Sequence, residues 1–489
     1  MKVSQPLSIP VLYNQALQIS KFSTEINMSQ NNENFYDVIA IGLGPFNLGL
    51  ACLTDNITDI KSLFLEQRSH FDWHPGMMLE SAHLQTPFMS DLVTLADPTH
   101  PLSFLNYIKQ QGRLYSFYIR ENFYLMRKEY NQYCQWATQQ VSNIRFNTQV
   151  INVKYDSINK CYQVECEDSR HSANKSLYFT KKLVLGTGPS PYIPESCLAL
   201  KNKVIHSSSY LNDKTELQKK KSITIVGSGQ SAAEIYYDLL QEIDVHGYEL
   251  NWITRAARFF PLEYSKLTLE MTSPEYVNYF YQLPAAKKES LIGRQKNLYK
   301  GINSSLINDI HELLYVKRLS HSFKTNLITN STLVNATDPI GSVQIGSEQE
   351  KQIKLDFHHD EQEKYFSLPS EGVVLATGYH YQLPEFLAPI TDRIQWDTLG
   401  RFAVNRNYSI DHNENEIFIQ NAELHTHGFA SPDLGMACYR NSIIIKEILG
   451  KAFYPIEERI AFQQFSVENF ASNPLSQVVS CDHEVESNT

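Results

Sequence analysis

The chain has 489 residues, of which 42% are hydrophobic, 12% aromatic and 20% charged, and its formal net charge at pH 7 is −10. This length exceeds what one hydrophobic core usually supports, so we expect two or three domains of an ordinary globular protein. The negative charge argues against a nucleic-acid or anionic-membrane partner, and no apolar run approaches the roughly 20 residues that span a bilayer.

The first 34 residues form a polar extension without a sustained apolar stretch, and they do not resemble a secretory signal. The seven cysteines are scattered, with no C-x-x-C pair and no Cys/His cluster. That pattern supports neither a disulfide framework nor a zinc site. The histidines form no metal-binding pattern either. These features favour a cytoplasmic protein without a metal centre.

The elements expected along the chain repeat one unit twice. YDVIAIGLG is a β-branched strand stopped by glycines, PFNLGLACLT is a helix, and KSLFLEQR is a second strand. A helical, aromatic-rich stretch follows at about 101–141, and then RFNTQVINVKYD and KCYQVECED alternate like antiparallel strands. KSITIVGSGQSAAEIYYDLL repeats the strand, glycine turn and helix, with YELNWITRAAR as its second strand. Residues 273–318 look helical, GVVLATGYHYQLP is a strand and turn, and IIIKEILG is a last helix.

The first glycine turn has the spacing of a dinucleotide site, Gly42-x-Gly44-x-x-Asn47. Gly42 allows a tight turn, and Gly44 lets the backbone approach a pyrophosphate at the N-terminus of a helix. Pro45 suits the first helical turn, where its missing N–H costs nothing. Glu66 ends the next strand, where an acid accepts hydrogen bonds from ribose hydroxyls. Strand, turn, helix and acid together predict a bound dinucleotide.

The second turn, Gly227-x-Gly229-x-x-Ala232, is followed by a strand that ends at Thr254-Arg255 instead of at an acid. An acid there would accept the 2′-hydroxyl of NADH, whereas an arginine pairs with the 2′-phosphate of NADPH. The alternative is that Arg255 is a solvated loop charge. The turn therefore predicts a second dinucleotide, with NADPH favoured.

Two dinucleotide sites narrow the chemistry to reduction of FAD by NADPH. Disulfide reductases need a redox-active cysteine pair beside the flavin, and none is evident, which leaves a monooxygenase or an oxidase-like enzyme. We predict an α/β fold with two Rossmann-like dinucleotide-binding domains and a small, mostly helical substrate subdomain. The boundaries expected are a polar extension at 1–34, the FAD-binding domain at 35–205 and 371–455, the NADPH-binding domain at 206–370 with a helical insert at about 265–320, and a polar C-terminal tail at 456–489.

Several segments, DVIAIGLGPFNLGLA, FDWHPGM, HLQTPFMSDLVTLADPT, VGSGQSAAE, LATGY and THG, occur in this order between about Tyr36 and Gly450. The chain resembles the N-hydroxylating flavin monooxygenases, which are the lysine, ornithine and diamine N-monooxygenases of siderophore biosynthesis. The resemblance implies that NADPH reduces FAD, that a flavin C4a-hydroperoxide forms with O2, and that a neutral primary amine takes its distal oxygen. It also implies no catalytic acid–base dyad, and it suggests a homo-oligomer, since relatives are often tetramers.

The resemblance further implies which residues contact the cofactors. Glu66 through His74 and Gln85 would line FAD, and the THG segment would close the flavin site. The second glycine turn with Arg255 would hold NADPH, and the A-T-G-Y segment would link the domains. Beyond the two turns, the residues implied are Trp73, His74, Gln85, Ser228, Gln230, Ser231, Thr377, Gly378, His427 and Gly428.

Two departures from the lysine and ornithine members concern the substrate. Those members have a lysine where this chain has Ser90, and a polar residue near the position of Leu269. Without both, the carboxylate of an amino acid would be buried unpaired, at a cost of several kcal/mol. The pattern favours an amine without a carboxylate, namely putrescine, cadaverine or histamine. Glu263 and Glu270 are candidates to bind a distal ammonium, whereas Leu269 would suit an imidazole.

Alternatives remain open at this point. Lys266 could replace the missing lysine, in which case the substrate would be L-lysine or L-ornithine. An uncoupled, NADPH oxidase-like flavoprotein is a third possibility, against which the intact glycines, Gln85 and A-T-G-Y argue. A related monooxygenase acting on sulfur or ketones is disfavoured by W-H-P-G-M and T-H-G.

Overall fold

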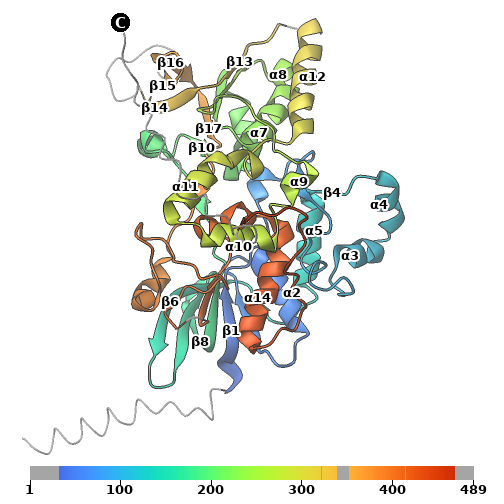
Figure 1. Ribbon diagram of the computed structural model, residues 1–489. Coiled ribbons are helices and arrows are strands. Elements are labelled where there is room, and N and C mark those ends of the chain that lie inside the picture. The colour runs from blue at the N-terminus through green and yellow to red at the C-terminus, as the bar shows by residue number, and fades with distance from the viewer. Residues whose placement is uncertain (1–31, 321, 339–351, 414, 468–489) are drawn as a thin grey trace, which may run out of the picture.

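The computed structural model describes residues 32–320, 322–338, 352–413 and 415–467. These residues form two lobes, one above the other in Figure 1, with α9 (Lys266–Leu269), α10 (Pro274–Gln282) and α11 (Ala285–Arg294) lying between them. Most of the expected N-terminal extension lies outside the described residues. Within the described part of the chain, no helix is long and apolar enough to cross a membrane.

The first lobe is built on a sheet whose strands run in the order β5 (Ile144–Arg145), β2 (Ser62–Leu65), β1 (Phe35–Ile41), β8 (His171–Leu185), β7 (Cys161–Asp168) and β6 (Thr148–Asp156), with β19 (Ile417–Ile419) beside β8. β5, β2, β1, β8 and β19 pair in parallel, and β7 and β6 extend the sheet antiparallel.

Both faces of this sheet are covered. Val38 and Ala40 of β1 pack in one core with residues of α2 (Pro45–Asp55), α5 (Arg127–Thr138) and α14 (Ala437–Leu449). Ile39 and Ile41 pack in another core, on the opposite face. A strand that is buried on both faces needs apolar side chains on both, which explains the unbroken run VIAI.

The second lobe has a parallel sheet in the order β10 (Ile205–His206), β17 (Gly372–Leu375), β11 (Ser222–Val226), β12 (Glu249–Ile253) and β13 (Thr325–Ile328). α6 (Tyr210–Leu217), α7 (Gln230–Gln241), α8 (Ile243–His246) and α12 (Ser304–Ser320) contribute to its core. An antiparallel sheet of β14 (Ser331–Thr337), β15 (Ile353–His359) and β16 (Lys364–Ser370) adjoins it. The predicted α/β fold with two Rossmann-like sheets is confirmed.

The stretch 273–318, expected to be helical, contains the three helices α10, α11 and α12. Pro284 precedes α11 and ends α10 because it cannot continue a helix. Gly301 separates α11 from α12, and a Cβ there would collide with the backbone nitrogen of Leu262. The short elements are α3 (Phe104–Gln110), α4 (Leu114–Arg120), α13 (Leu424–His427) and the strand pairs β3 (His83–Pro87) with β4 (Tyr124–Met126) and β9 (Ser190–Pro191) with β18 (Tyr379–His380).

Candidate functional site

The first glycine turn leads from β1 into α2, and buried groups of the first lobe contact it closely. Gly42 has φ +86°, and a Cβ on it would lie 2.6 Å from the carbonyl oxygen of Gly186. The Asn47 amide donates to the Gly42 carbonyl at 2.7 Å and accepts from Gln420 at 2.8 Å. Gly44 precedes α2 without a side-chain cap, and nothing lies within 4 Å of a Cβ built on it. The N-terminus of α2 therefore offers open backbone donors to an anion.

Glu66 and Pro45 adjoin this turn. Glu66 follows β2, and its two carboxylate oxygens accept from the backbone nitrogens of Leu43 and Arg68, each at 2.8 Å. A carboxylate has about four acceptor positions, so further donors can still bind it. Pro45 is the first residue of α2, as its fixed φ favours.

Trp73 and His74 lie at the edge of the first lobe, facing the second. The His74 ring is 4.8 Å from that of Trp73 and 6.0 Å from that of Tyr379. Desolvation, and then the charges of Arg127 and Arg68, lower the pKa of His74 to about 4, so its ring is neutral near pH 7. Its backbone has φ +52°, a conformation that is unusual for a residue with a side chain.

The A-T-G-Y segment crosses between the lobes. Thr377 donates to the carbonyl of Tyr192 at 2.5 Å, and the Gly378 carbonyl lies 3.0 Å from Nε2 of His206. Gly378 has φ +85°, with nothing within 4 Å of a Cβ position. The glycine is thus needed for its backbone conformation and leaves open space beside it.

The second glycine turn leads from β11 into α7. Gly227 sits where a Cβ would collide with the carbonyl of Ala376, whereas a Cβ on Gly229 meets only the Lys300 carbonyl, at 3.7 Å. Gln230 begins α7 and accepts from the backbone nitrogen of Asn303 at 2.8 Å. Ser228 and Ser231 flank these residues and are partly exposed. Arg255 is exposed two residues beyond the end of β12.

Gln85 joins the first lobe to the second turn. Its side-chain nitrogen lies 3.4 Å from Oε1 of Gln230 and 3.4 Å from the carbonyl of Gly301. Its own carbonyl accepts from the Tyr264 hydroxyl at 2.5 Å. The predicted flavin-side residue Gln85 and the predicted nucleotide-side residue Gln230 are therefore neighbours.

An ion pair between Arg127 and Glu234 also joins the lobes, and sequence reasoning missed it. The guanidinium binds both carboxylate oxygens, at 2.9 and 3.1 Å, and donates to the carbonyl of Met77 at 2.7 Å. The Glu234 side chain is 4% exposed. No local signal could reveal the pair, because its members lie 107 residues apart on different domains.

The THG segment forms a buried loop after β19. The His427 ring is stacked 4.5 Å from that of Tyr408, and its nitrogens lie 2.9 Å from the Thr426 hydroxyl and 3.2 Å from the carbonyl of Arg406. Burial keeps the pKa of His427 well below its usual range. Gly428 has φ +76° and faces the ring of Phe280. The His427 side chain therefore braces the loop from within.

Behind this loop lies a buried ion pair between Arg440 and Glu423, another feature that the sequence did not suggest. Both side chains are essentially inaccessible. The Arg440 guanidinium also donates to the carbonyl of Ser431 and lies 4.5 Å from the ring of Phe46, in the first glycine turn. The pair thus ties α14 and the THG loop to that turn.

Ser90 is buried and lies near a carboxylate that was not predicted, Asp433. A Cβ built on Gly435 would be 3.4 Å from the Ser90 hydroxyl and 3.0 Å from Oδ1 of Asp433. Burial raises the pKa of Asp433, although the backbone nitrogen of Gly435 donates to it at 2.6 Å. Asp433 also contributes to the raised pKa of Tyr264, after desolvation and Tyr124. The signal that could have found it is an acid in the turn Ser-Pro-Asp-Leu-Gly.

Glu270, predicted to contact the substrate, binds the C-terminal segment. Its carboxylate accepts from the backbone nitrogens of Phe462 and Gln463, each at 3.1 Å. Glu275 binds the same segment through the nitrogens of Ile460 and Ala461. A substrate contact of Glu270 stays a prediction, because a carboxylate that accepts from two backbone donors still has acceptor positions left. Leu269 is half-buried at the end of α9.

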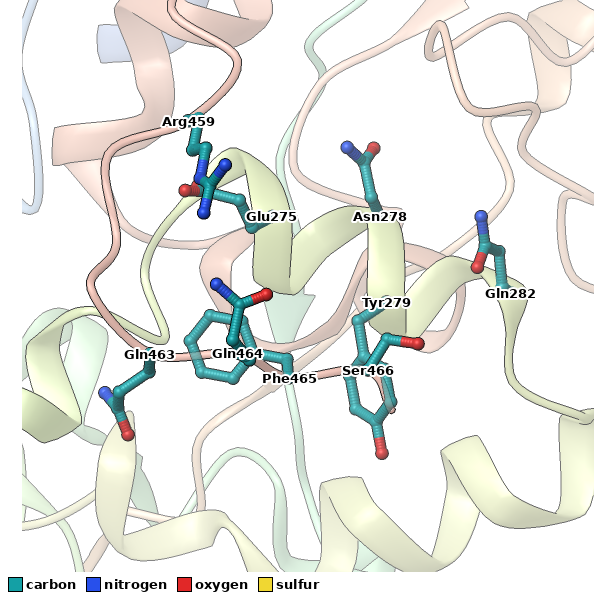
Figure 2. A pocket seen from close by; sticks show the side chains of 9 residues that line it. All are labelled: Glu275, Asn278, Tyr279, Gln282, Arg459, Gln463, Gln464, Phe465 and Ser466. Carbon is teal, nitrogen blue, oxygen red and sulfur yellow. The ribbon is translucent and has the colours of Figure 1, made fainter. Parts of the chain in front are cut away.

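The other carboxylate considered for a distal ammonium, Glu263, is exposed and accepts from the side chains of Asn297 and Thr268 at 2.9 and 3.0 Å. Residues 460–465 are also less peripheral than expected for a tail, since the Phe465 ring packs 5.2 Å from that of Tyr276 on α10. Figure 2 shows the pocket of about 200 Å³ that α10 and this segment enclose. Among the described residues, no group of three or more His, Cys, Asp and Glu side chains could hold a metal ion.

Comparisons with known proteins agree on the family. Residues 34–381 match the family of L-lysine 6-monooxygenase/L-ornithine 5-monooxygenase. The putrescine N-hydroxylase of Shewanella oneidensis is 53% identical over 452 residues, covering 92% of this chain and 88% of that protein. The putrescine N-hydroxylase of Acinetobacter baumannii is 47% identical over 436 residues, covering 89% of this chain and 95% of that protein.

Among solved structures, the FAD-bound cadaverine monooxygenase DfoA of Erwinia amylovora is 58% identical, with a TM-score of 0.85, over 88% of this chain and 98% of that one. The resemblance inferred from the sequence motifs is confirmed. This chain belongs to the L-lysine 6-monooxygenase/L-ornithine 5-monooxygenase family of flavin-dependent N-monooxygenases.

Proposed function

We propose that this protein uses FAD, NADPH and O2 to N-hydroxylate a primary diamine, putrescine or cadaverine, and so supplies a hydroxylamine for siderophore biosynthesis. The names of the similar proteins support a diamine. The observation that carries the proposal is the pair of Ser90 and Asp433. A buried serine replaces the cation that an amino-acid substrate needs, and the half-buried carboxylate of Asp433 lies near it.

The chemistry of Asp433 suits a diamine better than an amino acid. The distal ammonium of a diamine would offset the desolvation that raises the pKa of this carboxyl. The carboxylate of ornithine or lysine would instead meet a like charge in a buried place, without a cation to offset it. Histamine lacks a distal ammonium and would leave Asp433 unpaired when its imidazole is neutral.

We assign FAD to the first turn and NADPH to the second. Gly42, Gly44, Pro45 and Asn47 leave the N-terminus of α2 open to the FAD pyrophosphate, and Glu66 stands where the ribose hydroxyls would lie. Bound FAD supplies the oxygen chemistry. The remaining residues on the flavin side shape the FAD pocket and exclude water from it. The second turn, with Arg255, holds NADPH. These residues are Trp73, His74, Gln85, Thr377, Gly378, His427 and Gly428 on the flavin side, and Gly227, Ser228, Gly229, Gln230 and Ser231 at the second turn.

In this assignment the FAD-binding domain comprises residues 35–205 and 371–455, and the NADPH-binding domain comprises residues 206–370 with an insert at about 265–320. The first sheet takes its strands from 35–185 and 417–419, which supports the first part of that division. The second sheet takes its strands from 205–375, so the later boundary belongs after β17 and not at residue 370.

The test is Asp433→Asn, with Asp392→Asn on the surface as a control. We expect KM for putrescine and cadaverine to rise roughly 10- to 100-fold in Asp433→Asn, because a charge-assisted hydrogen bond is lost. KM for n-butylamine, which has no second ammonium, should change little, and anaerobic reduction of the flavin by NADPH should stay the same. An unchanged KM for both diamines, or product from ornithine or lysine alone, would overturn the proposal.

The pH dependence gives a second readout. An ammonium binds the ionised form of Asp433, so kcat/KM for the diamine should fall as pH falls through the raised pKa of this carboxyl. The same fall should be absent in Asp433→Asn. A matching fall in both proteins would assign the pH dependence to another group.

We also infer that the protein self-associates, with a tetramer as the state that the family resemblance favours, and that it acts in the cytoplasm. Supporting self-association, Tyr115 and Tyr118 on α4 are 78% and 74% exposed, and the adjacent Ile119 is 73% exposed, on a helix that projects from the body in Figure 1. The six cysteines within the described residues are free and buried, which suits a reducing compartment. Light scattering of Tyr118→Asp against the unaltered protein tests the first inference: equal masses would contradict a role for α4.

A further inference from the structure

The segment between α11 and α12, residues 296–303, lies across the second glycine turn. Its backbone is fixed on one side by two hydrogen bonds. The backbone nitrogen of Glu263 donates to the carbonyl of Asn297 at 3.0 Å, and the backbone nitrogen of Leu262 donates to the carbonyl of Ile302 at 2.7 Å. On the other side, the backbone nitrogen of Asn303 donates to Gln230 of α7 at 2.8 Å. The segment therefore has a defined position beside the place where the nucleotide would bind.

Lys300 of this segment stands near both Lys296 and Arg255. Lys300 has its carbonyl 3.7 Å from the Cβ position of Gly229, and its backbone nitrogen donates to the carbonyl of Lys296 one helical turn earlier, at 2.8 Å. Desolvation of the ammonium, and then the charges of Lys296 and Arg255, lower the pKa of Lys300. All three residues are nevertheless exposed, so a ligand can reach them.

The cluster of Arg255, Lys296 and Lys300 has no internal counter-charge. Across the part of the chain that the structure describes, no carboxylate forms an ion pair with any of the three. Three cations held together by a fixed backbone repel one another, and a bound phosphate would remove that repulsion. The end of the second strand of a Rossmann unit is where the adenosine 2′ position lies.

We propose that Lys296 and Lys300 join Arg255 in binding the 2′-phosphate of NADPH, so that the substrate-binding insert takes part in coenzyme selection. The inference rests on the proposed function, which places NADPH at this turn. It adds two selectivity residues from a segment outside the Rossmann unit itself. NADH has no 2′-phosphate, so these lysines would distinguish the two coenzymes without any change in the backbone of the insert.

The experiment measures binding of 2′,5′-ADP and of 5′-AMP to the FAD-bound protein and to Lys300→Ala, Lys296→Ala and the double variant, with Lys287→Ala as a control. Lys287 is an exposed lysine on α11, in the same insert. We expect each single variant to lose roughly tenfold in affinity for 2′,5′-ADP and none for 5′-AMP. Lys300→Arg should retain most of the affinity, and Lys287→Ala should match the unaltered protein.

Kinetics provides the second arm. The ratio of kcat/KM for NADPH to kcat/KM for NADH should fall by the same factor as the affinity for 2′,5′-ADP. Equal weakening of both adenine ligands, or no weakening of either, would overturn the assignment. Hydroxylamine formation from putrescine by the unaltered protein, at saturating NADPH and at saturating NADH, tests the proposed function separately. If no hydroxylamine forms with either coenzyme, the proposed function fails, whereas the binding data alone decide the phosphate site.

Discussion

The two glycine turns have the same spacing and open the same kind of helix, but the protein surrounds them differently. The first turn is held by buried side chains from the last part of the chain, with Gln420 on Asn47, and Asn441 and Arg440 on Phe46. The second turn is also tightly packed at its first glycine, Gly227, where a Cβ would collide with the Ala376 carbonyl. It differs at Gly229, where a Cβ meets only the Lys300 carbonyl, at 3.7 Å, and the adjacent segment carries exposed, unpaired cations.

This difference matches two kinds of ligand exchange. A turn held by buried side chains is suited to a cofactor that stays bound through many turnovers, because the cost of ordering the turn is met on folding. A turn beside exposed side chains is suited to a coenzyme that must enter and leave.

The largest effect is expected from alanine at Gly42 of the first turn, compared with alanine at Gly229 of the second. Gly42→Ala must strain a positive φ and displace the carbonyl of Gly186, so we expect loss of most bound FAD and of soluble yield. Gly229→Ala meets only an ordinary contact at negative φ, and we expect a few-fold rise in KM for NADPH with FAD retained. Flavin absorbance per chain measures the first and steady-state kinetics the second. Equal FAD content in the two variants would contradict the contrast.

The next effect concerns the buried pair behind the first turn. Arg440→Ala leaves Glu423 charged and buried, and should lower the free energy of unfolding by about 3–5 kcal/mol. Arg170→Ala breaks an exposed pair with Asp168 and should cause no measurable change. Thermal and urea unfolding of the FAD-bound proteins compare the two. Similar midpoints for both variants would show that the buried pair does not stabilise this side of the molecule.

A smaller effect is expected from the C-terminal segment. A chain that ends at Arg459 loses the contacts with Glu270 and Glu275, which hold residues 460–463 near α10, and α10 in turn packs on Gly428. We expect more peroxide per NADPH and a higher KM for the diamine, with the anaerobic rate of flavin reduction unchanged. A chain that ends at Val467 keeps the segment and serves as the matched control. The idea fails if both truncated proteins couple NADPH oxidation to product equally well.

The smallest effect is a pH dependence from His427. Its folded pKa lies well below the unfolded value of about 6.5, so the neutral ring is favoured in the folded protein. The resulting stabilisation is present above about pH 6.5 and decreases as pH falls below it. In His427→Gln the thermal midpoint should therefore change less between pH 7.5 and pH 5.5, a range of about two units around that value. An identical slope in both proteins would count against this assignment.

Local patterns were enough to predict the fold and both turns. β1 and β11 are short, apolar and followed by glycines, and the residues after them have helical character, so each unit is visible within 30 or so residues. The family resemblance likewise rested on contiguous motifs. What those patterns predict is the backbone path from β1 to α2 and from β11 to α7, and the structure bears that path out.

Side-chain partners that are distant in sequence could not be predicted in this way. The contacts of Glu270 with Phe462 and Gln463 could not be predicted because these partners come almost 200 residues later. The turn Ser-Pro-Asp-Leu-Gly marks Asp433 as an acid in a turn, but only the tertiary fold shows that it lies near Ser90. In both cases the decisive quantity is which donors the tertiary fold brings to a carboxylate, and that depends on packing between elements.

The junction of the two lobes has a consequence for how they can be exchanged between proteins. Met77, Leu79 and Ala82 come from the first lobe but are buried in the core of the second, and a side chain on Gly76 would collide with the carbonyl of Ser208. In a chimaera that replaces only residues 206–370 with those of a relative, the core of the new nucleotide-binding domain would therefore pack against Met77, Leu79 and Ala82 of the original protein, which need not fit it. The unit that can be exchanged between proteins is that domain together with the short stretch from His74 to Ala82. Chimaeras that take both from the same protein should fold, and those that separate them should be less stable.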